Sequence, residues 1–278
     1  MGNVLASGAV RKMKTTLEDP VSYSLPVGDS NVPMNSFIGK QLRLEYSGII
    51  NCIHCARKTN KSFSQGFCYP CFKRLAQCDT CIVSPEKCHY DAGSCREPEW
   101  GEQNCMIDHF VYLANTSGLK VGITRGTQVP TRWMDQGATQ ARPVFRVATR
   151  LDSGLVETIF KNHIADKTNW RNMLKGAADP VDLEQARQTL VADCAADISA
   201  LISERGVDAV TELPDEPETL IHYPVVEYPV KVSSFNLDKT PVAEGTLMGI
   251  KGQYLIFDAG VINMRKYAGY HMSLIQAG

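Results

Sequence analysis

Residues 52–55 read CIHC and residues 68–71 read CYPC, and these two cysteine pairs, with twelve residues between them, are the strongest structural signal in the sequence. Two residues between paired cysteines let the backbone turn so that both sulfurs face the same point. Four thiolates presented in this way suit a tetrahedral metal ion at about 2.3 Å. We therefore predict a structural zinc site with four ligands, Cys52, Cys55, Cys68 and Cys71. The alternative is a set of buried cysteines without a ligand.

A second group of cysteines follows directly. Nine of the ten cysteines lie between Cys52 and Cys105, and such clustering without a secretory signal favours metal binding over disulfides. For a second zinc site we prefer the next four cysteines, Cys78, Cys81, Cys88 and Cys95. Three neighbours are possible substitutes: His89, Cys105 and His109. An iron–sulfur cluster is the alternative to zinc, since closely spaced thiolates suit it too.

Composition limits the class of protein. The 278 residues are 44% hydrophobic and 21% charged, with a net charge of −1, and these are ordinary globular values. A chain of this charge does not coat nucleic acid by bulk attraction, so any such contact must come from local patches. The sequence contains no apolar run of the roughly 20 residues that cross a membrane. Residues 1–14 lack the order of a secretory signal, and we expect a cytoplasmic protein without a membrane partner.

The two chain ends have a different pattern from the middle. Residues 41–47 alternate as a half-buried strand, and short strand-like pieces follow residue 217. Three basic residues of the C-terminal pieces are candidates for phosphate contact, but we prefer to read them as exposed hairpin charges: Lys251, Arg265 and Lys266. The predicted fold class is α+β, with a β-rich domain built from both chain ends and a zinc-ribbon-like segment and a small α/β unit inserted between them. The predicted parts are residues 1–50, 51–108, 109–213 and 214–278.

Residues 109–213 carry the mixed pattern. Two apolar strands, residues 110–114 and 119–124, flank a turn and predict a hairpin. Pro130 is expected at the first position of a short helix that continues over residues 131–136, and Ser153 is expected to cap another helix. A single long helix is predicted for residues 181–205, with an apolar stripe and Gly206 after its end.

The hairpin and the helices after it resemble the core of the GIY-YIG endonuclease superfamily over about residues 109–167. The resemblance implies a metal-dependent, structure-selective endonuclease in which Tyr112 orients or deprotonates water, Arg132 neutralises the phosphate, and Glu157 binds Mg²⁺ or Mn²⁺. Two positions depart from the motif: Phe110 replaces its first glycine, and Lys120 replaces its second tyrosine. Lys120 would hold a phosphate, yet loss of cleavage is equally compatible with this change.

Basic residues interleave with aromatic residues in the cysteine segment, where residues 51–77 contain no acidic residue. Such a pattern can follow a phosphodiester chain and stack bases. The simpler interpretation is that the aromatic rings form the core of the zinc module. The candidate nucleic-acid contacts are Arg57, Lys58, Lys61, Lys73, Arg74 and, in the hairpin region, Arg125.

The chain as a whole is also similar to an uncharacterised prokaryotic family, on segments such as residues 68–72, 95–98 and 119–125. That resemblance implies no activity. The function we expect is a zinc-containing protein that binds nucleic acid, DNA before RNA, with cleavage as an added possibility. The alternatives are a non-catalytic zinc-stabilised scaffold for protein interaction, and an iron–sulfur or redox protein.

Overall fold

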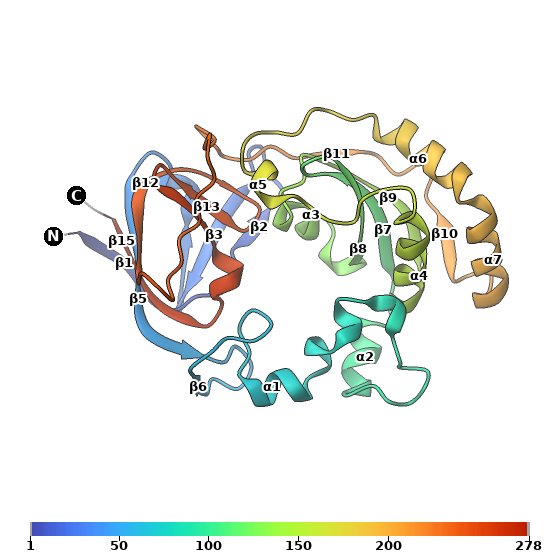
Figure 1. Ribbon diagram of the computed structural model, residues 1–278, viewed down its shortest axis with the longest axis horizontal. Helices are drawn as coiled ribbons and strands as arrows, with labels where there is room; N and C mark the ends of the chain where they lie inside the picture. The colour runs from blue at the N-terminus through green and yellow to red at the C-terminus, as the bar shows by residue number, and fades with distance from the viewer. Residues whose placement is uncertain (1, 277–278) are drawn as a thin grey trace.

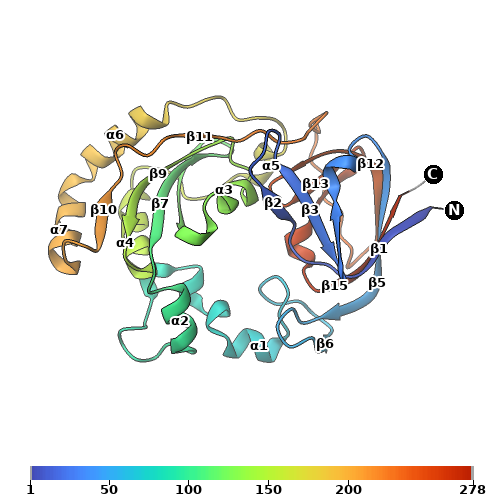
Figure 2. The same ribbon diagram turned by 180° about the vertical axis from the view of Figure 1, so that it is seen from behind.

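The computed structural model describes residues 2–276 and is a mixed α+β structure dominated by sheet. A β-rich body holds both chain ends, an α/β unit stands opposite it, and the cysteine segment runs between the two along one side (Figure 1). The view from behind shows the same arrangement (Figure 2).

Strands from the two ends of the chain pair in one sheet. Its order is β1-β15-β5-β12-β13-β14, with β6 on β5, and a smaller sheet has the order β2-β3-β4. The N-terminal strands are β1 (Asn3–Ala9), β2 (Lys14–Thr16), β3 (Ser22–Val27), β4 (Ser30–Pro33), β5 (Gln41–Asn51) and β6 (Lys58–Thr59). The C-terminal strands are β12 (Val242–Lys251), β13 (Tyr254–Phe257), β14 (Gly260–Asn263) and β15 (Tyr270–Gln276). The 3-10 helices η1 (Met34–Phe37) and η6 (Met264–Tyr267) connect strands of this body.

Strand β5 follows the alternation expected for residues 41–47 and extends it to Asn51. Leu42 and Leu44 are buried while Gln41 and Glu45 are exposed, because successive side chains of a strand point to opposite faces. In the sheet Leu44 lies opposite Leu274 of β15 and opposite Ala243 of β12. The centre of the β-rich body is thus formed by residues more than 190 positions apart.

An antiparallel sheet of order β10-β9-β7-β8, with β11 on β9, forms the α/β unit. Its strands are β7 (His109–Asn115), β8 (Leu119–Arg125), β9 (Gln140–Val147), β10 (Val210–Glu212) and β11 (Thr219–Leu220). Its helices are η5 (Gly126–Gln128), α3 (Thr131–Asp135), α4 (Arg150–Phe160), α5 (Trp170–Met173), α6 (Leu183–Asp193) and α7 (Ala195–Arg205). The β7–β8 hairpin agrees with the predicted one. Helix α4 starts earlier than expected, since Thr149, not Ser153, caps it by accepting from the Asp152 N–H.

The single long helix predicted for residues 181–205 is wrong, because the chain breaks at Cys194 into α6 and α7. Cys194 is fully buried, and Leu190 before it and Ile198 after it pack in one cluster with the sheet. The break lets α6 turn its apolar side onto the sheet and α7 turn its own onto helix α4, which one straight helix of this length would not do.

The β-rich body and the α/β unit share one hydrophobic core. Tyr112, Trp133 and Ala141 of the α/β unit pack in the same cluster as Leu44 and Leu274 of the β-rich body. Short helices carry the cysteine segment past this core: α1 (Tyr69–Arg74), η2 (Ala76–Cys78), η3 (Thr80–Ile82), η4 (Pro85–Lys87) and α2 (Pro98–Asn104).

Candidate functional site

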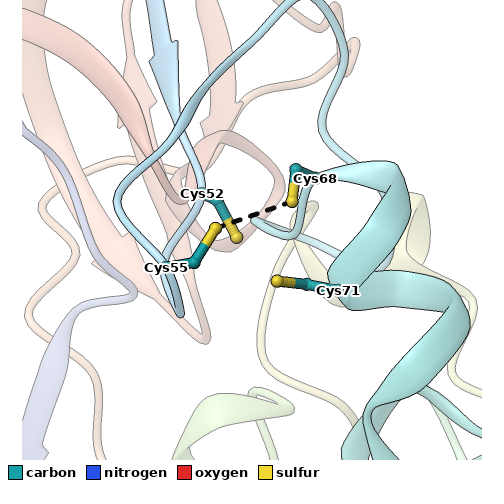
Figure 3. Close-up of side chains that lie close together, drawn as sticks. All are labelled: Cys52, Cys55, Cys68 and Cys71. Carbon is teal, nitrogen blue, oxygen red and sulfur yellow. Dashed lines mark hydrogen bonds between the residues drawn. The ribbon is translucent and has the colours of Figure 1, made fainter.

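Four cysteines meet where strand β5 ends and helix α1 begins. Cys52 and Cys55 come from the turn after β5, and Cys68 and Cys71 from the start of α1 (Figure 3). The four cysteine sulfurs all lie within 4.8 Å of one another, and those of Cys55 and Cys68 are 3.7 Å apart. Sulfurs about 2.3 Å from a tetrahedral zinc ion are separated by roughly 3.8 Å. The four residues predicted as the first site therefore form a cluster that could hold a metal such as zinc.

Backbone hydrogen bonds fix the two turns that present these sulfurs. The Cys52 carbonyl accepts from the Ala56 N–H at 2.9 Å, and the Cys68 carbonyl accepts from the Phe72 N–H at 2.9 Å. Gly66 joins the turns, since its carbonyl accepts from the Ile53 N–H at 2.9 Å. A side chain at Gly66 would come within 2.7 Å of Ile53 at a positive φ of 134°. Only glycine suits this position.

Burial and backbone dipoles set the acidity of the cluster. Burial opposes ionisation of Cys52, but hydrogen bonds from the backbone N–H groups of Cys55, Cys68 and His54 outweigh it and lower its pKa. Burial raises the pKa of Cys71, as do the neighbouring thiols. Such a crowded group of thiols favours a bound cation, which stabilises the thiolate form of every member.

The structure groups the remaining cysteines of the segment differently from the second zinc site preferred from the sequence. Cys78 packs beside Cys52, Cys68 and Cys71 in the core of the first cluster. Cys81, Cys88 and Cys95 line a small cavity together with Cys105, which sequence analysis named as a substitute. The structure thus brings together three members of the preferred set and places the fourth, Cys78, elsewhere.

Of the two histidines named as substitutes, His89 has a partner at each ring nitrogen, whereas His109 has one at Nδ1 and, within the described residues, none at its buried Nε2. His89 Nε2 lies 3.3 Å from Asp79 Oδ2, and its Nδ1 lies 2.9 Å from Ser94 Oγ. His109 is fully buried on β7 with its Nδ1 2.7 Å from the Ile107 carbonyl oxygen. Burial lowers the pKa of His109 to about 4, so its ring is neutral at physiological pH.

A cleft of about 440 Å³ opens where the β-rich body, the cysteine segment and the α/β unit meet. Five basic side chains line it: Lys12, Arg125, Arg132, Arg150 and Arg265. Two acidic side chains, Asp135 and Glu157, also line it. The cleft therefore has an excess of positive charge in a chain whose net charge is −1.

Both carboxylates of the cleft are engaged by other groups. Asp135 accepts from Lys12 Nζ at 2.7 Å and from Gln253 Nε2 at 2.8 Å. Glu157 forms an ion pair with Lys161 at 3.2 Å. Within residues 2–276, Arg132 and Arg265 form no salt bridge. Burial and the nearby guanidinium of Arg132 lower the pKa of Arg265, which indicates that the two arginines lie close to each other.

The residues assigned by resemblance to a nuclease do not all line this cleft, since Tyr112 is absent from its lining and Lys120 lines a separate pocket. Arg132 and Glu157 line the cleft, while Tyr112 is fully buried and donates to Gln136 Oε1 at 2.9 Å. Burial raises the pKa of Tyr112 to about 12. Lys120 is 4% exposed, and burial together with Arg132 lowers its pKa to about 8.

The candidate nucleic-acid contacts of the cysteine segment lie outside the lining of the cleft. Their side chains are exposed: Arg57, Lys58, Lys61, Lys73 and Arg74. The aromatic rings among them pack together, with Phe63 5.6 Å from Phe72 and 5.4 Å from Tyr69 between ring centroids. The interpretation of the rings as a small core therefore has direct support from these contacts. Arg125 is the member of the candidate set that reaches the cleft, where it donates to Asn104.

Three basic residues that line the cleft were not among the candidate site residues named from the sequence: Lys12, Arg150 and Arg265. Arg265 was read as an exposed charge but lines the cleft. Lys251 was read in the same way and is fully buried, with its Nζ donating to the Gly176 carbonyl at 2.9 Å. No local pattern marks these positions, because they meet only when the strands of the two chain ends pair.

None of the helices in the described residues 2–276 combines the length and apolar character needed to span a bilayer.

A family model described as "Protein of unknown function (DUF2797)" matches residues 39–272. No curated protein and no solved structure matches the chain.

Proposed function

The chain belongs to this DUF2797 family, whose description assigns no function, and on that premise we propose from its own residues that it is a zinc-containing protein that binds nucleic acid in its central cleft. The observation that carries the proposal is the lining of the cleft. Four arginines and one lysine, drawn from three parts of the chain, face a space of about 440 Å³.

The charge balance of the cleft favours an anionic ligand. Asp135 is neutralised by Lys12, and Glu157 is paired with Lys161. The cations left for a ligand are Arg125, Arg132, Arg150 and Arg265. Guanidinium groups bind phosphate oxygens through two parallel hydrogen bonds, and arginine is therefore common where proteins recognise phosphate.

The kind of lining favours a phosphodiester chain over a small apolar ligand. The apolar residues in the lining are aliphatic, for example Ile82, Val83 and Ile123, and aromatic side chains are missing from the part of the lining formed by residues 2–276. Sites for small cofactors are mostly apolar and aromatic with few polar groups. Phosphate contacts supply most of the sequence-independent affinity of proteins for nucleic acid.

Zinc in the first cysteine cluster would support nucleic-acid binding by stabilising the fold. A site closed by four cysteines leaves no open position for water, so its ion stabilises the fold and takes no part in chemistry. The cluster anchors the start of the segment that supplies Ile82, Val83 and Pro85 to the cleft.

A direct test compares binding by the wild type and two arginine variants. Labelled duplex DNA, single-stranded DNA and RNA are titrated with protein, and fluorescence anisotropy gives the affinity. We expect Arg132→Ala and Arg265→Ala each to weaken DNA binding about tenfold, or about 1.4 kcal/mol. Lys239→Ala removes an exposed lysine outside the cleft lining and should bind as the wild type does. Equal binding by all four proteins would contradict the proposal.

Phosphodiester cleavage is the second candidate, and one arrangement favours it. Strands β7 and β8, helix α3, strand β9 and helix α4 follow in the order of the nuclease core, and Arg132 and Glu157 line the same cleft. In this candidate Glu157 would hold Mg²⁺ or Mn²⁺, which supplies charge stabilisation at the phosphate. Tyr112, fully buried and with a pKa of about 12, would remain protonated and would not remove a proton from water.

The cleavage candidate has its own test. Branched and duplex DNA are incubated with wild type and Glu157→Gln in the presence of manganese. Cleavage by the wild type alone supports the candidate. Equal cleavage by both proteins removes Glu157 from it, and no cleavage by the wild type leaves binding as the function of the cleft.

A further inference from the structure

A second group of sulfurs encloses a small cavity in the cysteine segment. The cavity measures about 10 Å³, the space of one water-sized guest. Four thiols contribute to its wall, from η3, from the loops after η4, and from the end of α2: Cys81, Cys88, Cys95 and Cys105. Ala76, Ile82 and Trp100 line the same cavity, as do Asp79 and His89.

From this arrangement we infer a second structural metal centre, in which Cys81, Cys88, Cys95 and Cys105 bind a zinc-like divalent ion. It shares no ligand with the first cluster. The cavity has room for one ion, whereas a four-iron cluster needs far more space. Sulfur ligands in such number select a soft or borderline ion such as zinc.

Gly101 of α2 leaves room for the Cys95 sulfur beside the helix. A Cβ atom at Gly101 would lie 3.4 Å from Cys95 Sγ and 3.0 Å from the Tyr90 ring. The glycine therefore lets the loop that carries Cys95 approach the helix closely. The Cys105 N–H donates to the Gly101 carbonyl at 2.6 Å, which fixes Cys105 at the end of the same helix.

The other candidate metal ligands near the cavity already have partners, and this leaves the four thiols as the ligands. Asp79, Cys81 and His89 each offer an atom within 4.8 Å of the other two. Asp79, however, accepts from Arg96 Nε at 2.8 Å and from the Thr80 N–H at 2.6 Å. Both ring nitrogens of His89 lie beside other partners, Asp79 and Ser94. Cys78 and His109 do not line the cavity.

A partly buried arginine that also lines the cleft offsets part of the charge of this centre. Four thiolates around a divalent ion leave net negative charge, which needs a compensating cation when it is buried. Arg150 lies within electrostatic range of Cys81 and Cys105. Its Nη2 donates to the Ile82 carbonyl at 2.5 Å and its Nε to the Cys81 carbonyl at 3.4 Å.

Arg150 and Ile82 also connect the centre to the central cleft, because both line the cleft. The ion would thereby hold one wall of the cleft in place. The inference itself does not depend on what the cleft binds.

The test is the metal content of the purified full-length chain, measured by elemental analysis after loading with zinc and removal of the excess. We expect two zinc ions in the wild type, one in the double variant Cys88→Ser/Cys105→Ser, and two in Cys78→Ser. Cys78→Ser is the matched control, because its thiol lies between the two centres in sequence but outside the cavity. One ion in the wild type would overturn the inference. Loss of an ion from Cys78→Ser with two retained in the double variant would also overturn it.

A second measurement applies if the double variant does not fold. The wild type is loaded with ¹¹³Cd and examined by NMR. Two resonances in the range of tetrathiolate cadmium are expected, and a single such resonance would overturn the inference.

Discussion

Gly66 shows how one residue controls the first cysteine cluster. Gly66 and Gly118 have nearly the same positive φ, 134° and 130°, but a Cβ atom at Gly118 would meet nothing within 4 Å. Gly66→Ala should lower the free energy of unfolding by about 1–3 kcal/mol more than Gly118→Ala, since the backbone strain is shared and only the clash with Ile53 differs. Urea unfolding measures both variants. Equal losses of unfolding free energy in the two variants would mean that Ile53 can move aside without destabilising the fold.

Lys120 provides a pH-dependent test. Burial, with a contribution from Arg132, lowers its pKa from 10.5 to about 8, so between these values the unfolded chain binds more protons than the folded chain. The contribution of Lys120 to the free energy of unfolding therefore rises with pH across this window and is a constant penalty below it. Lys120→Met should stabilise the protein at pH 7 by about 1–3 kcal/mol.

The check is urea unfolding at pH 7 and at pH 9.5 for the wild type, Lys120→Met and the exposed control Lys239→Met. The increase between the two pH values should be smaller in Lys120→Met than in the other two proteins. An identical increase in all three would show that Lys120 keeps an ordinary pKa in the folded chain.

At the scale of elements, the sequence predicts what local periodicity determines. Strand β5 and the β7–β8 hairpin were predictable because alternation and turn residues are local signals. The break at Cys194 was not, because both halves of residues 181–205 keep a helical pattern and only packing on the sheet and on α4 separates them. The first metal site was predictable because it too depends on a local signal. The spacing within and between the two cysteine pairs brings the four ligands together.

Helix α4 depends on close packing against η4. A Cβ atom at Gly154 would lie 2.4 Å from the Glu86 backbone nitrogen. Glycine to alanine inside a helix ordinarily stabilises by about 1 kcal/mol, but the contact here is with backbone, which cannot move aside. Gly154→Ala should therefore destabilise the chain by at least about 1–3 kcal/mol.

Thr158→Ala is the control in the same helix, at an exposed position, and should be neutral or slightly stabilising. Thermal unfolding monitored by circular dichroism compares the two. Stabilisation by Gly154→Ala would show that η4 is free to move from α4.

At the scale of the whole molecule, the cleft is the feature that could not be predicted from the sequence. Arg125 and Arg132 are close in sequence, but Lys12 and Arg265 join them only through the pairing of strands from the two chain ends. Pairing of the ends was expected from their shared β-rich pattern, whereas the core shared with the α/β unit was not. Long-range convergence leaves no periodic trace in one sequence.

Removal of the metal should affect the cysteine segment more than the β-rich body. The β-rich body packs in a large hydrophobic core that it shares with the α/β unit, while the cysteine segment has a small core. A chelator should therefore increase hydrogen exchange in residues 52–105 and leave β5 and β15 protected. Hydrogen exchange with mass spectrometry measures this. Unchanged exchange in residues 52–105, or loss of protection throughout the chain, would contradict the structural role assigned to the metal.

The salt dependence of DNA binding tests the central claim most directly. If Arg125, Arg132, Arg150 and Arg265 contact phosphates, the logarithm of the binding constant should fall with the logarithm of salt concentration with a slope of about −3 to −4. The double variant Arg132→Ala/Arg265→Ala should reduce the steepness of that slope by about 2. A slope near zero in the wild type, or an unchanged slope in the double variant, would contradict nucleic-acid binding in the cleft.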